Sequence, residues 1–264
     1  MDTILFEHDR ELPGLVTITL NRPDKLNAIN GTMQRELQAV CLLLRDDSEA
    51  RVVIVTGAGR AFSAGADLGR RRPGDGNQSP PLVSGASPLA ERISASAGNR
   101  TSDALESLDQ VTIGAVNGLA IGGGVAFLSC LDIRLAAQSA WFSIPEVDLD
   151  IPMTWNSLPR FIREIGPART KELVMTCDRF SAEDALRWGF LNHVTADEQL
   201  MPRTRALAAK LLAKDPISLA VTKSTTNALA KLMVPAEVTH SDREYLMLAR
   251  QLTAERLNPS RARK

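Results

Sequence analysis

The apolar positions along the chain follow two different periods, and each period predicts its own kind of element. Residues 16–20 alternate apolar and polar side chains, and residues 52–55 are apolar and β-branched throughout. Both patterns are typical of β-strands, the second of a strand that is covered on both faces. Residues 111–116 and 132–135 predict a third and a fourth strand on the same grounds.

Helical periodicity separates these strands and dominates the last quarter of the chain. Residues 33–45 predict a helix, with Thr32 as its candidate N-cap, and Ser181 opens a capping-box sequence ahead of another. The alternation of strands and helices predicts an α/β fold with covered strands. From about residue 200 onward nearly every residue fits a helix. We therefore divide the chain into a core, residues 1–200, and a C-terminal helical region, residues 201–264.

One long uncharged stretch allows two interpretations. Residues 110–131 contain no charged side chain, and their glycines at 114, 118 and 122 are spaced four apart. The length and spacing suit a membrane helix that dimerises through GxxxG. Five glycines in this stretch favour a strand and a turn instead, because glycine destabilises a helix. No signal peptide is visible at the start of the chain, so we expect a cytoplasmic protein without membrane insertion.

The charges of the chain balance overall but not locally. There are 31 basic and 31 acidic residues among 264, which argues against a nucleic-acid binder. Residues 1–200 carry 19 basic and 26 acidic side chains, a net charge of −7, whereas residues 201–264 carry 12 and 5, a net charge of +7. We expect the basic C-terminal helices to contact the acidic core, within or between subunits. Three separated cysteines and three scattered histidines predict no metal site.

Two glycine-rich turns are the main candidates for chemistry. Residues 63–68 follow the second predicted strand, and residues 117–127 follow the third and lead into an apolar helical segment. Such turns expose backbone N–H groups, and a helix N-terminus favours negative charge. Two such turns can each contribute one N–H group that donates a hydrogen bond to the same carbonyl oxygen, and the two donors together form an oxyanion hole. The alternative is that the glycines only let two layers pack closely.

A serine hydrolase is a further interpretation of the first of these turns. Ser63 lies in a sequence that approximates the G-x-S-x-G nucleophile elbow, and His240 is the candidate base. An elbow serine follows its strand directly, whereas residues 57–62 separate Ser63 from the predicted strand. The spacing therefore argues against this interpretation.

Five segments together resemble the signatures of the enoyl-CoA hydratase/isomerase (crotonase) family, in the family's order and approximate spacing. They are residues 21–28, 61–68, 115–124, 143–146 and 178–191. The resemblance implies a crotonase-like spiral of ββα units with a C-terminal α-helical trimerisation region. It also implies an acyl-CoA thioester as substrate, no separate cofactor, and self-association as a trimer or a dimer of trimers.

The resemblance also implies roles for particular residues. The N–H groups of Ala64 and Gly123 would hold the thioester oxygen. The residues expected to contact CoA are Lys25, Ala28, Ala64, Gly65, Ala66, Asp67, Leu68 and Gly123. Arg70 to Arg72 and the basic C-terminal helices are candidate partners of the CoA phosphates, which need cations. The segment 70–88 would then cover the active site.

The family's hydratases use two glutamates, and this chain has one of them. Glu146 occupies the second position, but Ala126 stands at the first, where it cannot orient or activate water. A single carboxylate suffices to move a proton between C2 and C4 of a 3-enoyl-CoA, which is isomerisation. Ile144, Pro145 and Val147 could form an apolar wall that raises the pKa of Glu146.

The roles of Asp148, Asp150 and Trp155 are open, and so is a second possible function of the protein. If residues 146–150 are extended, Asp148 and Asp150 share a face with Glu146, and either aspartate could replace the missing glutamate. Trp155 could narrow the acyl pocket or only pack a helix. The sequence thus predicts an enoyl-CoA isomerase or hydratase-like enzyme with Glu146 as general acid/base. The alternative is an acyl-CoA binder that has lost turnover.

Overall fold

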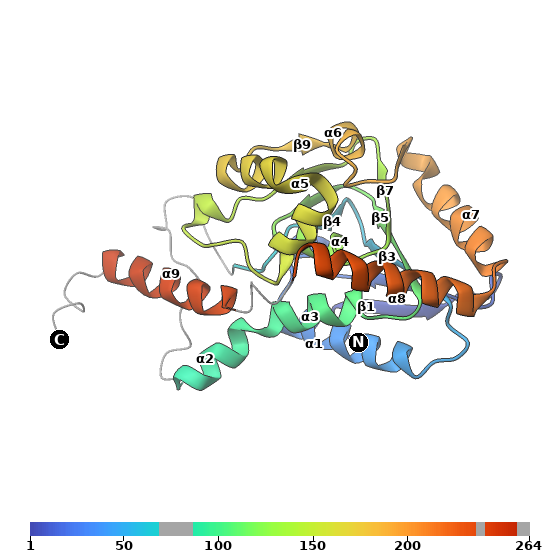
Figure 1. Ribbon diagram of the computed structural model, residues 1–264, viewed down its shortest axis with the longest axis horizontal. Coiled ribbons are helices and arrows are strands. Elements are labelled where there is room, and N and C mark those ends of the chain that lie inside the picture. Colours follow the sequence, from blue (N-terminus) through green and yellow to red (C-terminus); the bar gives the residue numbers. More distant parts are fainter. Residues whose placement is uncertain (69–86, 236–240, 258–264) are drawn as a thin grey trace.

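The computed structural model describes residues 1–68, 87–235 and 241–257, and its main layer is a six-stranded sheet (Figure 1). In spatial order its strands are β1 (Ile4–His8), β2 (Leu15–Leu20), β3 (Val52–Gly57), β5 (Val111–Val116), β7 (Ile133–Ala137) and β10 (His193–Thr195). β1 pairs with β2 in antiparallel fashion, and every other neighbouring pair is parallel. All residues of β3 and β5 are buried, which explains their apolar sequences.

A smaller sheet lies at the ends of these strands. Its order is β4 (Ala61–Ser63), β6 (Leu119–Ile121), β8 (Trp141–Ser143) and β9 (Phe180–Ser181). Three times the chain passes from a strand of the large sheet to one of the small sheet and then to helical structure. The helical parts are α2 (Pro88–Ala95) with α3 (Ala97–Glu106), then α4 (Gly123–Leu128), then η2 (Val147–Leu149) with α5 (Ser157–Thr176). The predicted spiral of ββα units is therefore confirmed.

Two predicted boundaries are displaced by side chains that cap the elements. α1 (Gly31–Arg45) begins earlier than predicted, because Asn30 is its N-cap and accepts a hydrogen bond of 2.9 Å from the Met33 N–H. The prediction of Thr32 as N-cap is wrong. β7 begins one residue late, because the Asp132 carboxylate accepts hydrogen bonds from Thr112 in β5 instead. The capping box at Ser181 is present and opens α6 (Ala182–Arg187).

The uncharged stretch at residues 110–131 folds as strand, strand and short helix within the core. It contains β5, β6 and α4, whose residues are largely buried. None of the helices that the structure describes is both long and apolar enough to cross a bilayer. The interpretation of this stretch as a membrane helix is therefore wrong.

In the part of the C-terminal region that the structure describes, three helices are joined to the core by ion pairs. η3 (Asp197–Gln199) leads into α7 (Leu200–Leu212), followed by α8 (Pro216–Met233) and α9 (Asp242–Leu257). α7 packs against β3, β5 and β7, and α9 contacts α2 beside the layered body (Figure 1). Lys223 binds Asp132 at 2.8 Å, and Lys231 binds Glu106 at 3.2 Å. The expected contact between basic helices and acidic core thus exists within a single chain.

α8 exposes several large apolar side chains. Its exposed side chains include Ile217, Val221, Leu229, Leu232 and Met233, and none of its residues, all of which the structure describes, is buried. Self-association and the division of the chain at residue 200 stay predictions.

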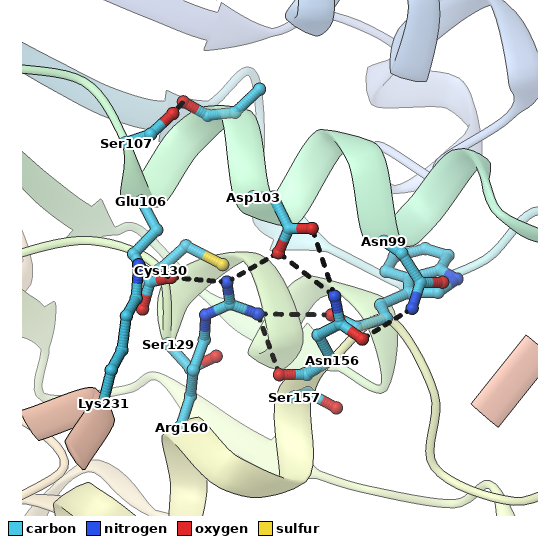
Figure 2. Close-up of polar contacts among 12 residues, drawn as sticks. Asn99, Asp103, Glu106, Ser107, Ser129, Cys130, Asn156, Ser157, Arg160 and Lys231 are labelled. Carbon is cyan, nitrogen blue, oxygen red and sulfur yellow. Dashed lines mark hydrogen bonds and ion pairs between the residues drawn. The ribbon is translucent and has the colours of Figure 1, made fainter. Parts of the chain in front are cut away.

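A buried arginine joins α5 to α3 (Figure 2). Arg160 of α5 is 1% exposed, and its guanidinium donates to Glu106 at 2.8 Å and to Asp103 at 3.1 Å, both in α3. Arg163 and Lys231 also bind the Glu106 carboxylate. Burial by itself raises the pKa of Glu106, but the three cations outweigh it and lower the pKa to about 2.

We predict that Arg160→Ala lowers the free energy of unfolding by about 3 kcal/mol, because it leaves the buried Glu106 carboxylate without its main partner. Urea unfolding measures this change. The control is Arg169→Ala, which removes an exposed pair with Glu172 and should cost less than about 1 kcal/mol. Equal losses in the two variants would contradict the role given to Arg160.

Candidate active site

The two glycine-rich turns meet, as expected for a joint site. Gly65, with φ of +82°, lies against the chain at the start of α4. A methyl group added to Gly65 would lie 2.6 Å from the Ile121 carbonyl oxygen and 3.2 Å from the Gly123 amide nitrogen. No side chain fits in this space, so glycine is required where the turns after β4 and β6 touch.

The first turn offers the N–H of Ala66 rather than that of Ala64. The Ala64 N–H already donates to the Leu26 carbonyl at 2.8 Å, which removes the basis for its expected role. Hydrogen bonds from Ile29 to Gly65 and from Asp67 to Ile29 hold the next residues in an extended path. Ala66 between them is exposed, and its N–H donates to no residue that the structure describes.

The second turn offers the N–H of Gly123. Gly123 is the first residue of α4, so its N–H has no acceptor within the helix. The preceding N–H, of Gly122, donates to Ser143 at 2.9 Å. The helix N-terminus adds a positive potential at the Gly123 N–H. Ala66 and Gly123 therefore supply one unpaired donor from each turn, which is the composition of an oxyanion hole.

Glu146 lies beside these donors with a buried carboxyl group. It follows β8, and a methyl group added to Gly122 would lie 2.7 Å from its Oε1. Its Oε2 is buried and has no hydrogen-bond partner among the described residues. Burial raises the pKa of Glu146 to about 7, against a smaller opposing effect of its own backbone N–H. At neutral pH such a carboxyl can both take up and release a proton.

The neighbouring aspartates do not join Glu146. Residues 147–149 form the 3-10 turn η2, not an extended segment, so the prediction that the three acids share a face is wrong. Asp148 and Asp150 are exposed, and Asp150 ends the turn with φ of +56°. Val147 is exposed as well, whereas Ile144 is buried as the expected apolar wall requires. The structure therefore gives no support to a catalytic Asp150.

Ala126 lies in the core and brings no polar group to the site. It belongs to α4 and is 1% exposed. The position where the family's hydratases have their first glutamate thus carries a buried methyl group. Water would have to be oriented by some other residue.

The serine hydrolase interpretation fails on the position of Ser63. The residue is 0% exposed, and its hydroxyl donates to the Asn27 carbonyl at 2.8 Å and accepts from the Gly65 N–H at 3.1 Å. A buried hydroxyl that both donates and accepts a hydrogen bond stabilises the turn and cannot attack a substrate. His240, the candidate base, lies outside the described residues.

A cavity of about 860 Å³ opens next to the turn after β4. It lies among α1, α2, α3 and α9, and three residues expected to contact CoA line it: Ala66, Asp67 and Leu68. The other five residues expected to contact CoA are not part of this lining: Lys25, exposed at the end of η1 (Pro23–Lys25), Ala28, Ala64, Gly65 and Gly123. A cavity of this volume falls within the range typical of small-molecule sites.

Two arginines that the sequence did not single out also line the cavity. They are Arg35 of α1 and Arg100 of α3. The sequence pointed to Arg70 to Arg72, which lie outside the described residues, and to the basic C-terminal helices. Lys223 and Lys231 of α8 instead bind acidic groups of the core. Helix packing determines which cationic side chains line the cavity. No pattern in the sequence distinguishes these side chains from other basic residues.

Arg22 and Asn27 hold the segment before α1 against the turn after β4. The Arg22 guanidinium donates to the Asp67 carboxylate at 2.8 Å and to the Ala28 carbonyl. The buried Asn27 amide donates to the carbonyls of Ala58 and Ala61. Both residues belong to segment 21–28, which carries the family resemblance. Their place in that segment is the feature of the sequence that could have identified them as residues of the site.

Comparison with known proteins decides the family. The model of the enoyl-CoA hydratase/isomerase family matches residues 10–251 of this chain. The chain belongs to the enoyl-CoA hydratase/isomerase family. It is therefore an acyl-CoA enzyme of the hydratase or isomerase kind.

Relatives of both kinds resemble this family member. A crotonyl-CoA hydratase of Syntrophomonas wolfei is 30% identical over 227 residues, which are 86% of this chain and 82% of the relative. The crystal structure of an enoyl-CoA hydratase from Bacillus anthracis has a TM-score of 0.77 at 29% identity and covers 98% of this chain and 95% of its own. A monofunctional enoyl-CoA isomerase from M. smegmatis has a TM-score of 0.71 at 28% identity, covering 88% and 95%.

The described residues contain no group of three or more His, Cys, Asp or Glu side chains that could hold a metal ion. The expectation that this family member needs neither a metal nor a separate cofactor stays a prediction.

We predict that Glu146→Gln stabilises the protein at pH 8 by about 3 kcal/mol but hardly changes its stability at pH 4. Between pH 4.5 and about 7 the unfolded chain ionises Glu146 while the folded protein keeps the proton, so wild-type stability falls as the pH rises. Glutamine carries no charge and avoids this loss.

Urea unfolding at both pH values measures the effect. The exposed neighbour provides a matched control, and Asp148→Asn should change stability by less than about 0.5 kcal/mol at either pH. An equal gain at pH 4 and pH 8 would show that burial of the charge is not the cause.

Proposed function

We propose that the protein is an enoyl-CoA isomerase in which Glu146 is the general acid and base. The observation that carries this proposal is the buried Glu146 carboxyl beside Gly122, whose Oε2 has no hydrogen-bond partner among the described residues, together with the methyl group of Ala126 at the other glutamate position. A group with a pKa of about 7 exchanges protons readily at neutral pH. One such group is sufficient for a reaction that removes a proton and returns it.

The proposed reaction begins when the carboxylate of Glu146 takes a proton from C2 of a 3-enoyl-CoA. The electron pair of that C–H bond forms a dienolate, whose charge develops on the thioester oxygen. The N–H groups of Ala66 and Gly123 donate to this oxygen, and one such donor is typically worth about 3–4 kcal/mol in the transition state. Glu146 then returns the proton to C4, and the double bond lies between C2 and C3. Atoms and charge balance without a further reactant.

Hydration requires a group that orients water, and we find no such group beside Glu146 among the described residues. Adding water to a 2-enoyl-CoA by the two-carboxylate route needs a second group that orients the water. Ala126 has none, and Asp148 and Asp150 are exposed on η2. Isomerisation is therefore favoured over hydratase activity.

An acyl-CoA binder without turnover is the second candidate function. Ala126 is the observation that favours it, because the family's two-glutamate arrangement is incomplete. Such a protein would keep the cavity and the two turn amides but would not need an ionising Glu146. The raised pKa of this carboxyl supports the enzyme instead.

We predict that Glu146→Gln lowers the kcat for isomerisation of 3-hexenoyl-CoA by at least about 100-fold, because the amide cannot accept the C2 proton. The 2-enoyl product is followed by absorbance. Asp148→Asn, two residues away and exposed, should stay within twofold of wild type.

Three other results would count against this function. Full isomerase activity of Glu146→Gln excludes the proposed mechanism. Formation of 3-hydroxyacyl-CoA from a 2-enoyl-CoA identifies a hydratase. Binding of these thioesters without any turnover by the wild-type protein identifies the binder.

We also propose that Arg35 and Arg100 bind the CoA phosphates, since both line the cavity beside Ala66. The double variant Arg35→Ala/Arg100→Ala should weaken binding of butyryl-CoA by about tenfold or more. Affinity for the butyryl thioester of pantetheine, which lacks the phosphates, should not change. Titration calorimetry measures both, with the exposed Arg45→Ala as control. Equal weakening for the two thioesters would contradict a phosphate contact.

A further inference from the structure

The indole of Trp155 lies directly against the backbone of two glycines. A methyl group added to Gly123 would lie 2.3 Å from its Cζ3, and one added to Gly98 would lie 2.1 Å from its Cδ1. The ring also stacks on Phe127, with centroids 5.1 Å apart and planes at 28°. Trp155 thus fills the space between α3 and the N-terminus of α4, and the remaining part of its surface lines the 860 Å³ cavity.

This position places the indole next to the acyl group of a bound substrate. If the thioester oxygen accepts a hydrogen bond from the Gly123 N–H, it lies about 2.9 Å from that nitrogen. The acyl chain leaves from the same carbonyl group, beside the residue that the indole covers. The Glu146 carboxyl lies against the preceding glycine, Gly122. Carbons 2 to 4 therefore lie near Glu146, and the rest of the chain meets Trp155.

Hydrogen bonds hold the backbone of Trp155 and of the next residue in place from several sides. Trp155 and Asn156 both have left-handed backbones, with φ of +65° and +55°, which bulky residues rarely adopt. The Arg160 guanidinium donates to the Asn156 carbonyl at 2.8 Å and to the Trp155 carbonyl at 3.4 Å. The Asn156 side chain accepts from Asn99 at 2.8 Å and donates to Asp103.

Asp242, at the start of α9, completes this arrangement. Its buried carboxylate accepts from the Asn156 N–H at 2.9 Å and from the Asn99 side chain at 2.8 Å. The C-terminal helix is thereby tied to the residue that follows Trp155. With its backbone held in this way and its ring packed against Gly98, Gly123 and Phe127, the indole forms a wall of the cavity.

We propose that Trp155 is a specificity-determining residue that limits the length of the acyl chain, and that Asp242 is a positioning residue that keeps the indole in place. The inference rests on the proposed function in one respect, namely that the ligand is an acyl-CoA whose thioester lies at Gly123. It does not depend on which reaction follows.

Binding of saturated acyl-CoA esters tests the inference without turnover. Titration calorimetry with butyryl-, octanoyl- and dodecanoyl-CoA should show that the wild-type protein binds the short ester and loses affinity with length. Trp155→Ala should bind the two longer esters at least about tenfold more tightly than wild type, with butyryl-CoA within threefold. Trp155→Phe, which keeps a smaller ring, should give an intermediate profile. Trp188→Phe, a tryptophan outside the cavity lining, should leave the profile unchanged.

Asp242→Asn tests the positioning role while nearly preserving side-chain size. It should shift the length profile in the same direction as Trp155→Ala and leave the affinity for free CoA unchanged. An equal loss of affinity at every chain length would show a merely structural role and overturn this part.

The remaining outcomes separate this inference from the proposed function. An unchanged length profile in both Trp155→Ala and Trp155→Phe overturns the inference alone, as does a wild-type protein that binds all three esters equally. A wild-type protein that binds none of the three esters overturns the proposed function and the inference with it.

Discussion

The active site depends on one buried guanidinium. Arg160 is removed from water and is paired with Glu106 and Asp103 of α3, so α5 and α3 must meet at this point. The same guanidinium binds the carbonyls of Trp155 and Asn156 and so determines the path of the segment that enters α5. An unpaired charge in the interior is costly, which leaves this path little freedom. The indole beside the glycine-rich turn follows from that requirement.

Close approach of backbones determines the rest of the site. Gly65, Gly122 and Gly123 each lie where a methyl group would collide with a neighbouring group: the Ile121 carbonyl, the Glu146 carboxyl and the Trp155 ring. Glycine at these positions lets two turns, a carboxyl group and an aromatic ring share one small volume. The buried Oε2 of Glu146 then has no hydrogen-bond partner among the described residues, an arrangement that costs stability and suits proton transfer. Local losses of stability of this kind are common at the active sites of enzymes.

Family membership and the details of this chain answer different questions. The family match over residues 10–251 establishes an acyl-CoA enzyme of the hydratase or isomerase kind. The choice between the two reactions rests on the chain's own residues, above all on the methyl group of Ala126 and the single buried carboxyl of Glu146. A shared fold supports several chemistries, so the argument for isomerisation must come from the site.

The sequence by itself determined part of the secondary structure, because this depends on local patterns, and its family resemblance pointed to the chemical groups of the site. Hydrophobic periodicity predicted four of the strands, the glycine-rich turns were visible as local patterns, and the resemblance to the family singled out Glu146 and the missing first glutamate. Only the tertiary structure decided which groups are available. The N–H of Ala64 is taken by Leu26 from a distant segment, so Ala66 is the donor that remains. The turn at residues 147–149 exposes Asp148 and Asp150, and helix packing turns Arg35 and Arg100 toward the cavity. Such contacts join residues far apart in the chain, and no local pattern encodes them.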